Sequence, residues 1–125
     1  MTPPPRRTPL LRSFGYAFSG VGELLRTQRN ARIHVGITLA VLLAGWWLGI
    51  TRSEWLVVVL LIGAVLCAEA LNSAIETVVD LASPQLHPLA GRAKDLAAGG
   101  VLLLAIAAAV AGAIIFVPYL WALVF

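Results

Sequence analysis

The sequence predicts an all-α membrane protein in which an N-terminal amphipathic surface helix precedes three transmembrane helices. The chain has 125 residues, and 60% of them are hydrophobic. Its mean hydropathy of +0.92 is typical of a membrane protein rather than a soluble domain. Three separate apolar runs are each long enough to cross the hydrocarbon core of a bilayer. We therefore expect a single membrane domain over residues 10–125.

Residues 1–9 are expected to form a flexible tail, because this stretch holds four of the seven prolines together with two arginines. A surface helix is expected next, over about residues 10–28, where apolar side chains recur at helical spacing between polar ones. The apolar positions are Leu11, Phe14, Phe18, Val21, Leu24 and Leu25. This pattern is typical of a helix that lies in the membrane interface.

The three transmembrane helices are expected over about residues 31–50, 54–82 and 92–118. Trp46 and Trp47 mark the outer end of the first span, because aromatic side chains gather at the membrane surface. The arginines that precede the apolar run of this span, which begins at Ile33, are Arg6, Arg7, Arg12, Arg26, Arg29 and Arg32. By the positive-inside rule they predict a cytosolic N-terminus.

A polar stripe on the second span is the most informative feature of the chain. It consists of Glu69, Asn72, Ser73, Glu76 and Asp80. At about 100° per residue, these side chains occupy a wedge of roughly 100° on one face of an α-helix. A charged side chain at the bilayer centre costs about 2.5 to 3.5 kcal/mol, so the stripe needs water, a cation or a polar partner. The stripe is therefore the candidate functional site.

Lys94 and Asp95, at the start of the third span, complete a set of residues suited to phosphoryl transfer. Mg²⁺ takes oxygen ligands and bridges substrate phosphates, so one or two carboxylates are sufficient to hold it. Lys94 can offset charge on phosphate oxygens, and a carboxylate deeper in the membrane can accept the proton of a lipid hydroxyl. The chain has no G-x-x-x-x-G-K-[ST] sequence, so a nucleotide site here would be unrelated to the P-loop.

Two segments of the sequence resemble the prokaryotic integral-membrane lipid kinases, a family of diacylglycerol kinases and undecaprenol kinases. The segments are E-A-L-N-S-A-I-E-T-V-V-D at residues 69–80 and H-P-L-A-G-R-A-K-D at residues 87–95. The similarity extends from Arg12 to about Pro118. It implies a homotrimer in the bacterial inner membrane, with active sites shared between neighbouring subunits at the cytosolic face. It also implies transfer of the ATP γ-phosphate to a membrane lipid alcohol with Mg²⁺.

The resemblance further implies roles for individual residues. Glu69 is the implied general base and Glu76 an implied metal ligand, while Glu69, Asn72 and Ala98 are implied contacts of the lipid substrate. The implied ATP-binding residues are Tyr16, Gln28, Glu76, Gln85, Leu86, His87, Lys94 and Asp95.

Gln28 departs from the family pattern, because the family usually has a glutamate at this position that shares the metal with the residue matching Glu76. The amide oxygen of Gln28 can still bind a metal, but it brings no charge. We expect a weaker metal site at Gln28 than in the family, or compensation by Glu23.

A small proton-coupled transporter or channel subunit is the alternative function, because intramembrane carboxylates also form ion pathways. The acidic residues lie toward the cytosolic end, which favours the kinase, whereas a transporter favours acids at the midplane and broken helices. A non-catalytic assembly protein would leave the polar stripe without a purpose. Nucleic acid is not an expected partner, because no basic surface with interleaved aromatic residues accompanies the arginines.

Structural roles compete with functional ones for several residues. Asn72 with Ser73 could be polar packing between protomers, and Lys94 with Asp95 could cap a helix start. The two histidines, His34 and His87, are expected to be interface or loop residues rather than catalysts. Segments 29–34 and 87–90 look more like the undecaprenol kinase branch, and diacylglycerol is the second candidate for the lipid acceptor.

Overall fold

The protein is described by a computed structural model that covers residues 2–4 and 9–125. These residues form four helices and no strand: α1 (Leu10–Thr27), α2 (Arg29–Leu48), α3 (Arg52–Ala82) and α4 (Pro88–Val124). The helices α2, α3 and α4 are each long and apolar enough to cross a membrane. The predicted all-α fold with three long apolar helices is therefore confirmed. Within the predicted tail, residues 1 and 5–8, including Arg6 and Arg7, lie outside the described residues.

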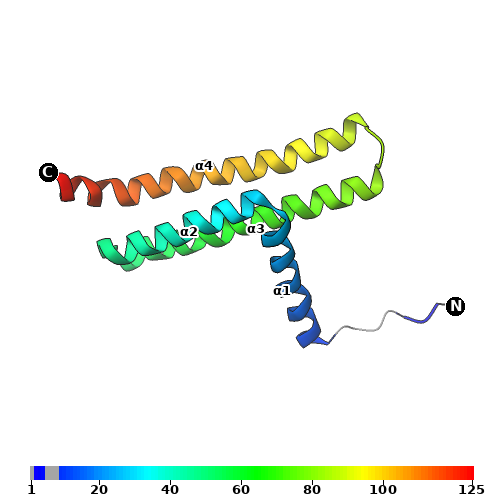
Figure 1. Ribbon diagram of the computed structural model, residues 1–125, viewed down its shortest axis with the longest axis horizontal. Coiled ribbons are helices and arrows are strands. Elements are labelled where there is room, and N and C mark those ends of the chain that lie inside the picture. Colours follow the sequence, from blue (N-terminus) through cyan, green and yellow to red (C-terminus); the bar gives the residue numbers. More distant parts are fainter. Residues whose placement is uncertain (1, 5–8) are drawn as a thin grey trace.

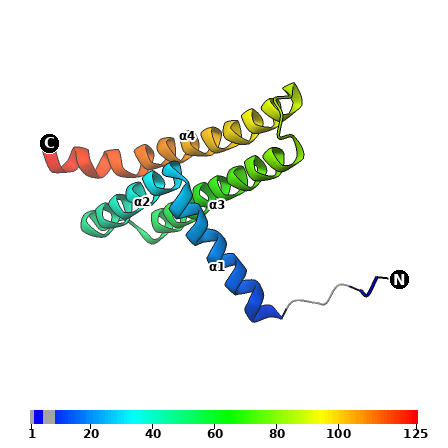
Figure 2. The same cartoon turned by 45° about the vertical axis from the view of Figure 1, so that its right-hand side comes forward.

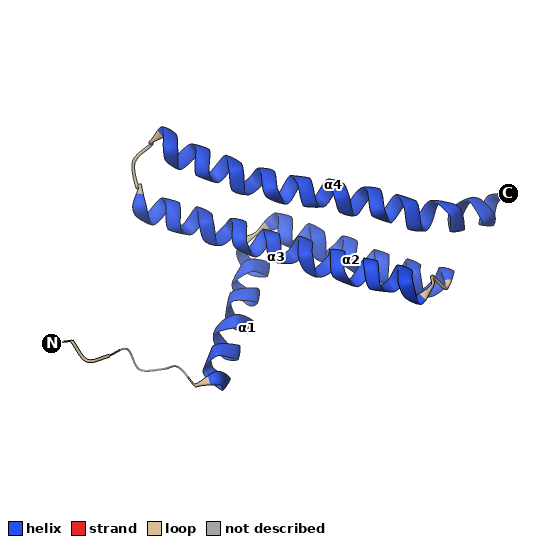
Figure 3. Ribbon diagram, turned by 180° about the vertical axis from the view of Figure 1, so that it is seen from behind, coloured by secondary structure: helices blue, strands red, loops and turns tan. Residues whose placement is uncertain are grey.

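The three long helices form an elongated bundle from which α1 projects. Helices α3 and α4 run antiparallel and side by side, and α2 lies along the first part of α3 (Figure 1). Helix α1 leaves the bundle at a steep angle where α2 begins, and the last turns of α3 continue past this point (Figure 2). The α3–α4 loop lies at one end of the bundle, whereas the α2–α3 turn and the C-terminus lie at the other (Figure 3).

Helix α4 is longer than the predicted third span. It begins at Pro88 and continues through Pro118 to Val124. A proline in the first turn removes no intrahelical hydrogen bond, because the first N–H groups of a helix have no partner within it. An interior proline is tolerated in a membrane helix, where neighbouring groups satisfy the freed carbonyl. Pro118 therefore does not end the helix.

The corner between α1 and α2 is a single residue, Gln28, with an extended backbone (φ −106°, ψ 112°). Arg32 stabilises this corner by donating hydrogen bonds from Nη1 to the carbonyl oxygens of Leu25 (3.2 Å) and Arg26 (2.8 Å). These carbonyls end α1 and lack partners within the helix, so a guanidinium is a favourable cap for them. Arg32 thereby fixes the direction in which α1 leaves the bundle.

The α2–α3 turn depends on a close approach between backbone and an indole ring. Gly49 adopts the left-handed conformation (φ 67°), which glycine takes without strain. The N–H groups of Gly49 and Ile50 donate to the carbonyl of Gly45 at 3.0 and 3.2 Å. A Cβ atom on Gly45 would lie 2.9 Å from the Trp55 ring and 3.1 Å from the Ile50 side chain. The absence of a side chain at Gly45 lets α2 and α3 meet here.

Glu54 links α3 to α4 near the same end of the bundle. The Tyr119 hydroxyl donates a hydrogen bond to Oε1 of Glu54 at 3.0 Å. Thr51 caps α3 by accepting a hydrogen bond from the Glu54 N–H at 3.2 Å. The buried apolar cluster of this region consists of Ile50, Val58 and Ile115. This end of the bundle is therefore held by packing and by one polar contact between helices.

Most large apolar side chains of the bundle are exposed in the single chain. On α4, for example, Leu103 is 72% exposed and Ile114 is 71% exposed. Apolar surface on this scale is suited to contact with lipid tails or with another protein chain rather than with water.

We predict that Gly45→Ala destabilises the fold. The added Cβ would overlap the Trp55 ring, and overpacking of this kind costs about 1 to 3 kcal/mol. Thermal unfolding of the purified protein in detergent, followed by circular dichroism, measures the change. Gly36→Ala, in the same helix but with nothing within 4 Å of the added Cβ, is the matched control. An unchanged midpoint for Gly45→Ala would contradict the packing described for this turn.

Candidate functional site

The polar stripe of α3 runs from a buried carboxylate to an exposed one. Glu69 is 2% exposed, Asn72, Ser73 and Glu76 are half-buried, and Asp80 is exposed. Three buried oxygens, Oε1 of Glu69, Oδ1 of Asn72 and Oγ of Ser73, have no hydrogen-bond partner among the described residues. Because buried polar atoms are rarely left unpaired, these oxygens are candidate contacts for a ligand or a partner chain.

Glu69 faces α2, where His34 is its nearest charged or ionisable contact in the described chain. Nε2 of His34 lies 3.2 Å from Oε1 of Glu69, and the two side chains are 21% and 3% exposed. The contact is within ion-pair distance, but it falls short of hydrogen-bond geometry. The sequence predicts an interface or loop role for His34 rather than a catalytic one. Its proximity to Glu69 depends on how α2 packs against α3, which the residue spacing within either helix does not indicate.

Lys94 and Asp80 join the start of α4 to the end of α3. Nζ of Lys94 donates a hydrogen bond to Oδ1 of Asp80 at 2.5 Å, across the α3–α4 loop. The negative charge of Glu76 also acts on the Lys94 ammonium group. The two halves of the family-like sequence are thus brought together, with a cation facing the acidic stripe.

A cavity of about 390 Å³ lies beside this ion pair, between the end of α3 and the start of α4. Five of the lining residues were predicted from the sequence or belong to the stripe: Asp80, Gln85, Leu86, His87 and Lys94. The loop is ordered by two local hydrogen bonds, from Ser83 Oγ to the Gln85 carbonyl (2.8 Å) and from the Leu89 N–H to His87 Nδ1 (3.1 Å). The cavity is therefore open to solvent and is lined by the Lys94 cation and by polar groups of the loop.

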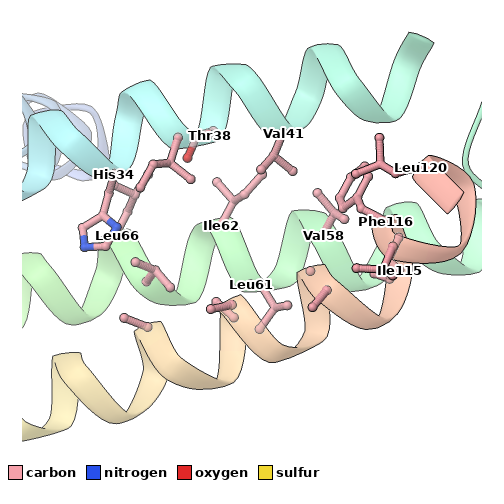
Figure 4. A pocket seen from close by; sticks show the side chains of 18 residues that line it. His34, Thr38, Val41, Val58, Leu61, Ile62, Leu66, Ile115, Phe116 and Leu120 are labelled. Carbon is pink, nitrogen blue, oxygen red and sulfur yellow. The ribbon is translucent and has the colours of Figure 1, made fainter. Parts of the chain in front are cut away.

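A second, apolar cavity of about 530 Å³ lies between α2, α3 and α4. Its walls are almost entirely aliphatic or aromatic, and His34 and Thr38 are the polar residues that line it (Figure 4). It runs from His34 toward Phe116 and Leu120 near the far end of α4 (Figure 4). Since His34 contacts Glu69, the buried carboxylate lies next to one end of an apolar space.

Seven of the predicted site residues line neither cavity in the single chain: Glu69, Asn72 and Glu76 on the stripe, and Tyr16, Gln28, Asp95 and Ala98 away from it. Tyr16 is 67% exposed on α1, and Gln28 forms the α1–α2 corner. Asp95 and Ala98 are exposed on α4. Their predicted roles remain predictions.

The described residues contain no cluster of three or more His, Cys, Asp or Glu side chains able to hold a metal ion. The donors of the stripe are nevertheless of the right kind for Mg²⁺, because they are carboxylate, amide and hydroxyl oxygens. Magnesium commonly takes most of its ligands from water and substrate phosphates, so one or two protein carboxylates are sufficient. The residues therefore fit a magnesium ion that arrives with a phosphate-bearing substrate.

Most of the chain is similar to known proteins of one family. The profile of the family described as prokaryotic diacylglycerol kinase matches residues 15–116. An undecaprenol kinase of Bacillus subtilis (strain 168) is 42% identical over 109 residues, covering 87% of this chain and 89% of the relative. A diacylglycerol kinase of Synechocystis sp. is 45% identical over 115 residues, covering 91% of this chain and 66% of the relative. A diacylglycerol kinase of Escherichia coli (strain K12) is 33% identical over 104 residues, covering 82% of this chain and 84% of the relative.

Proposed function

The chain belongs to the prokaryotic diacylglycerol kinase family of membrane lipid kinases, and we propose that it transfers the γ-phosphate of ATP to undecaprenol. The observation that carries this proposal is the position of Glu69. Its unpartnered carboxylate oxygen is buried between an apolar cavity and the end of the bundle that carries Lys94. A kinase that joins a lipid alcohol to a water-soluble phosphate donor needs a base at such a boundary.

Undecaprenol is preferred to diacylglycerol on two grounds. The relative named undecaprenol kinase matches over nearly the full length of both chains, whereas the slightly more identical Synechocystis relative matches over 66% of its own length. Segments 29–34 and 87–90 also resemble the undecaprenol kinase branch. Diacylglycerol is the second candidate, since two of the compared relatives carry that name.

Glu69 acts in this proposal as the general base. The carboxylate takes the proton of the lipid hydroxyl, the hydroxyl oxygen forms a bond to the γ-phosphorus, and the bond from that phosphorus to the ADP oxygen breaks. A positioned base of this kind typically contributes about 10² to 10⁴-fold to the rate. The apolar cavity beside His34 supports the proposal, because it offers space for part of the lipid chain while the hydroxyl reaches Glu69.

Lys94, Glu76 and the α3–α4 loop form the proposed nucleotide side of the site. Lys94 exchanges its Asp80 contact for phosphate oxygens, and the cavity beside it has room for part of the nucleotide. Glu76 is the proposed ligand of Mg²⁺, with Gln28 as a weaker ligand and Asn72 as a lipid contact. When bound, Mg²⁺ neutralises phosphate charge and orients the triphosphate. Tyr16, Asp95 and Ala98 complete the proposed site.

The proposed assembly is a homotrimer in the bacterial inner membrane, with α1 in the cytosolic interface and the N-terminus in the cytosol. The arginines that precede and begin α2 support this orientation. The exposed apolar faces of α3 and α4 support contacts between subunits as well as with lipid. Shared sites would also explain why one chain does not gather every predicted residue.

We predict that Glu69→Gln reduces lipid phosphorylation by about 10² to 10⁴-fold, because the amide cannot accept the hydroxyl proton. The assay uses purified protein in detergent and lipid with labelled ATP, Mg²⁺ and a panel of lipid alcohols that includes undecaprenol and diacylglycerol. Nucleotide affinity should stay within about twofold, since a neutral amide replaces a carboxylate that contacts the lipid and not ATP. Glu54→Gln, the same change near the other end of α3, is the matched control.

Two outcomes would contradict this assignment. Wild-type turnover in the Glu69→Gln variant would remove Glu69 as the base. Proton flux through wild-type protein in vesicles, with no label in any lipid, would instead support the transporter alternative.

We predict that Lys94→Met raises the KM for ATP by about 10- to 100-fold. A hydrogen bond to a charged group is worth about 1.5 to 3 kcal/mol, and a factor of ten corresponds to about 1.4 kcal/mol. Steady-state kinetics at saturating lipid measure the effect. Arg92→Met, which removes the same charge from an exposed position two residues away, should leave the KM for ATP unchanged. Equal KM values for both variants would show that Lys94 does not contact the phosphates.

We predict that Glu76→Gln raises the Mg²⁺ concentration needed for half-maximal activity by about tenfold, equivalent to about 1.4 kcal/mol of lost metal binding. A Mg²⁺ titration at constant ATP measures this shift. Gln28→Glu, which restores the charge usual in the family, should lower the requirement. If neither variant changes the Mg²⁺ dependence, the metal is bound elsewhere.

A further inference from the structure

We infer that His34 is a positioning residue for Glu69: its imidazole holds the carboxylate in the orientation that receives the acceptor hydroxyl. This inference deepens the proposed lipid kinase activity and rests on it. The sequence alone predicts an interface or loop role for this residue rather than a catalytic one. Three observations support the new assignment.

The first observation is the contact itself. Nε2 of His34 and Oε1 of Glu69 are 3.2 Å apart, and Glu69 is nearly fully buried. A buried carboxylate in apolar surroundings is strongly destabilised unless a polar group lies against it. Among the described residues, the imidazole is the side chain placed to do this. Removing it would leave Glu69 free to take other rotamers or to move toward the polar end of α3.

The second observation is that the position of His34 is itself fixed. Ala31, one turn earlier on α2, is completely buried (0% exposed). Arg32 ties this first part of α2 to the carbonyls that end α1. The backbone just before His34 is therefore held by the burial of Ala31 and by the Arg32 hydrogen bonds, so the imidazole is presented from a rigid element, as a precise orientation of the base requires.

The third observation is that His34 lines the apolar cavity as well as touching Glu69. The imidazole of His34 lies at one end of the cavity (Figure 4). A lipid alcohol whose chain lies in this cavity would therefore bring its hydroxyl past the imidazole to reach the Glu69 carboxylate. One carboxylate oxygen accepts two hydrogen bonds. Oε1 can therefore accept one bond from the Nε2–H of His34 and one from the incoming hydroxyl, after a small rotation of the imidazole into alignment.

In the transfer step, the hydroxyl proton moves to the Glu69 carboxylate as the oxygen attacks the γ-phosphorus and ADP departs. His34 gains and loses no covalent bond in this step. Its contribution is to keep Oε1 directed at the hydroxyl, so its removal should lower kcat and leave ATP binding unaffected.

Two variants separate this role from simple wall packing. His34→Leu keeps a side chain of similar size but removes the donor, whereas His34→Gln keeps an N–H donor. We expect His34→Leu to lower kcat for lipid phosphorylation about 10- to 100-fold, with the KM for ATP within about twofold of wild type. We expect His34→Gln to recover most of this loss. The thermal midpoint of each variant verifies that the protein is folded.

The decisive measurement is a double-mutant cycle with Glu69→Gln. If His34 acts through Glu69, then His34→Leu has no further effect on the residual activity of the Glu69→Gln protein. If His34 only packs against the cavity wall, His34→Leu lowers kcat by the same factor in the wild-type and the Glu69→Gln proteins. This result would overturn the inference. Wild-type kcat in His34→Leu, or equal loss in His34→Leu and His34→Gln, would overturn it as well.

The proposed function has its own separate failure. If wild-type protein labels no lipid alcohol, both proposals fall together. The other case is that the wild-type protein phosphorylates a lipid but the His34 variants do not show the expected changes in kcat. The kinase assignment then stands, and the proposed role of His34 is wrong.

Discussion

The organisation of this protein depends on the burial of one carboxylate, that of Glu69, on a helix whose other faces are apolar. An acidic side chain in this environment is costly to hold, so the surrounding helices must supply something polar next to it. Helix α2 supplies His34 at 3.2 Å. Helix α2 is placed in turn by the corner at Gln28, by the hydrogen bonds of Arg32 and by the close contact of Gly45 with Trp55. The packing at both ends of α2 thus helps to position His34 against Glu69.

The site has two chemically different sides that meet at the polar stripe. On one side of Glu69 lies a cavity with almost entirely apolar walls. On the other side, exposure increases along the polar stripe, from buried Glu69 to exposed Asp80, which pairs with Lys94 beside the loop. A reaction between a membrane-bound alcohol and a triphosphate from water requires such a gradient, because each substrate stays in the medium that it prefers until the reacting atoms meet.

Several parts of this arrangement were predictable from the sequence because they are local. Helical periodicity placed the five polar residues on one face of α3, and the position of Lys94 at the start of the following helix indicated a cation near this stripe. The contact between His34 and Glu69 was not predictable, because it depends on the register between two helices that are distant in sequence. The continuation of α4 through Pro118 was missed for another reason: proline ends helices in water more reliably than in a membrane. The roles of all the predicted site residues remain predictions, and the single chain does not bring Tyr16, Gln28, Asp95 and Ala98 together with the others.

The single-residue corner at Gln28 has a consequence for how the enzyme is seated in its membrane. Helices α2 and α3 run antiparallel and His34 lies opposite Glu69, so the start of α2 is level with the middle of the polar stripe. If α1 rests among the lipid headgroups, it therefore sets how deep the polar stripe lies in the bilayer. It would hold the Glu69 carboxylate just below the membrane surface and Lys94 above it, and bilayers of different thickness would be accommodated at the opposite end of the bundle.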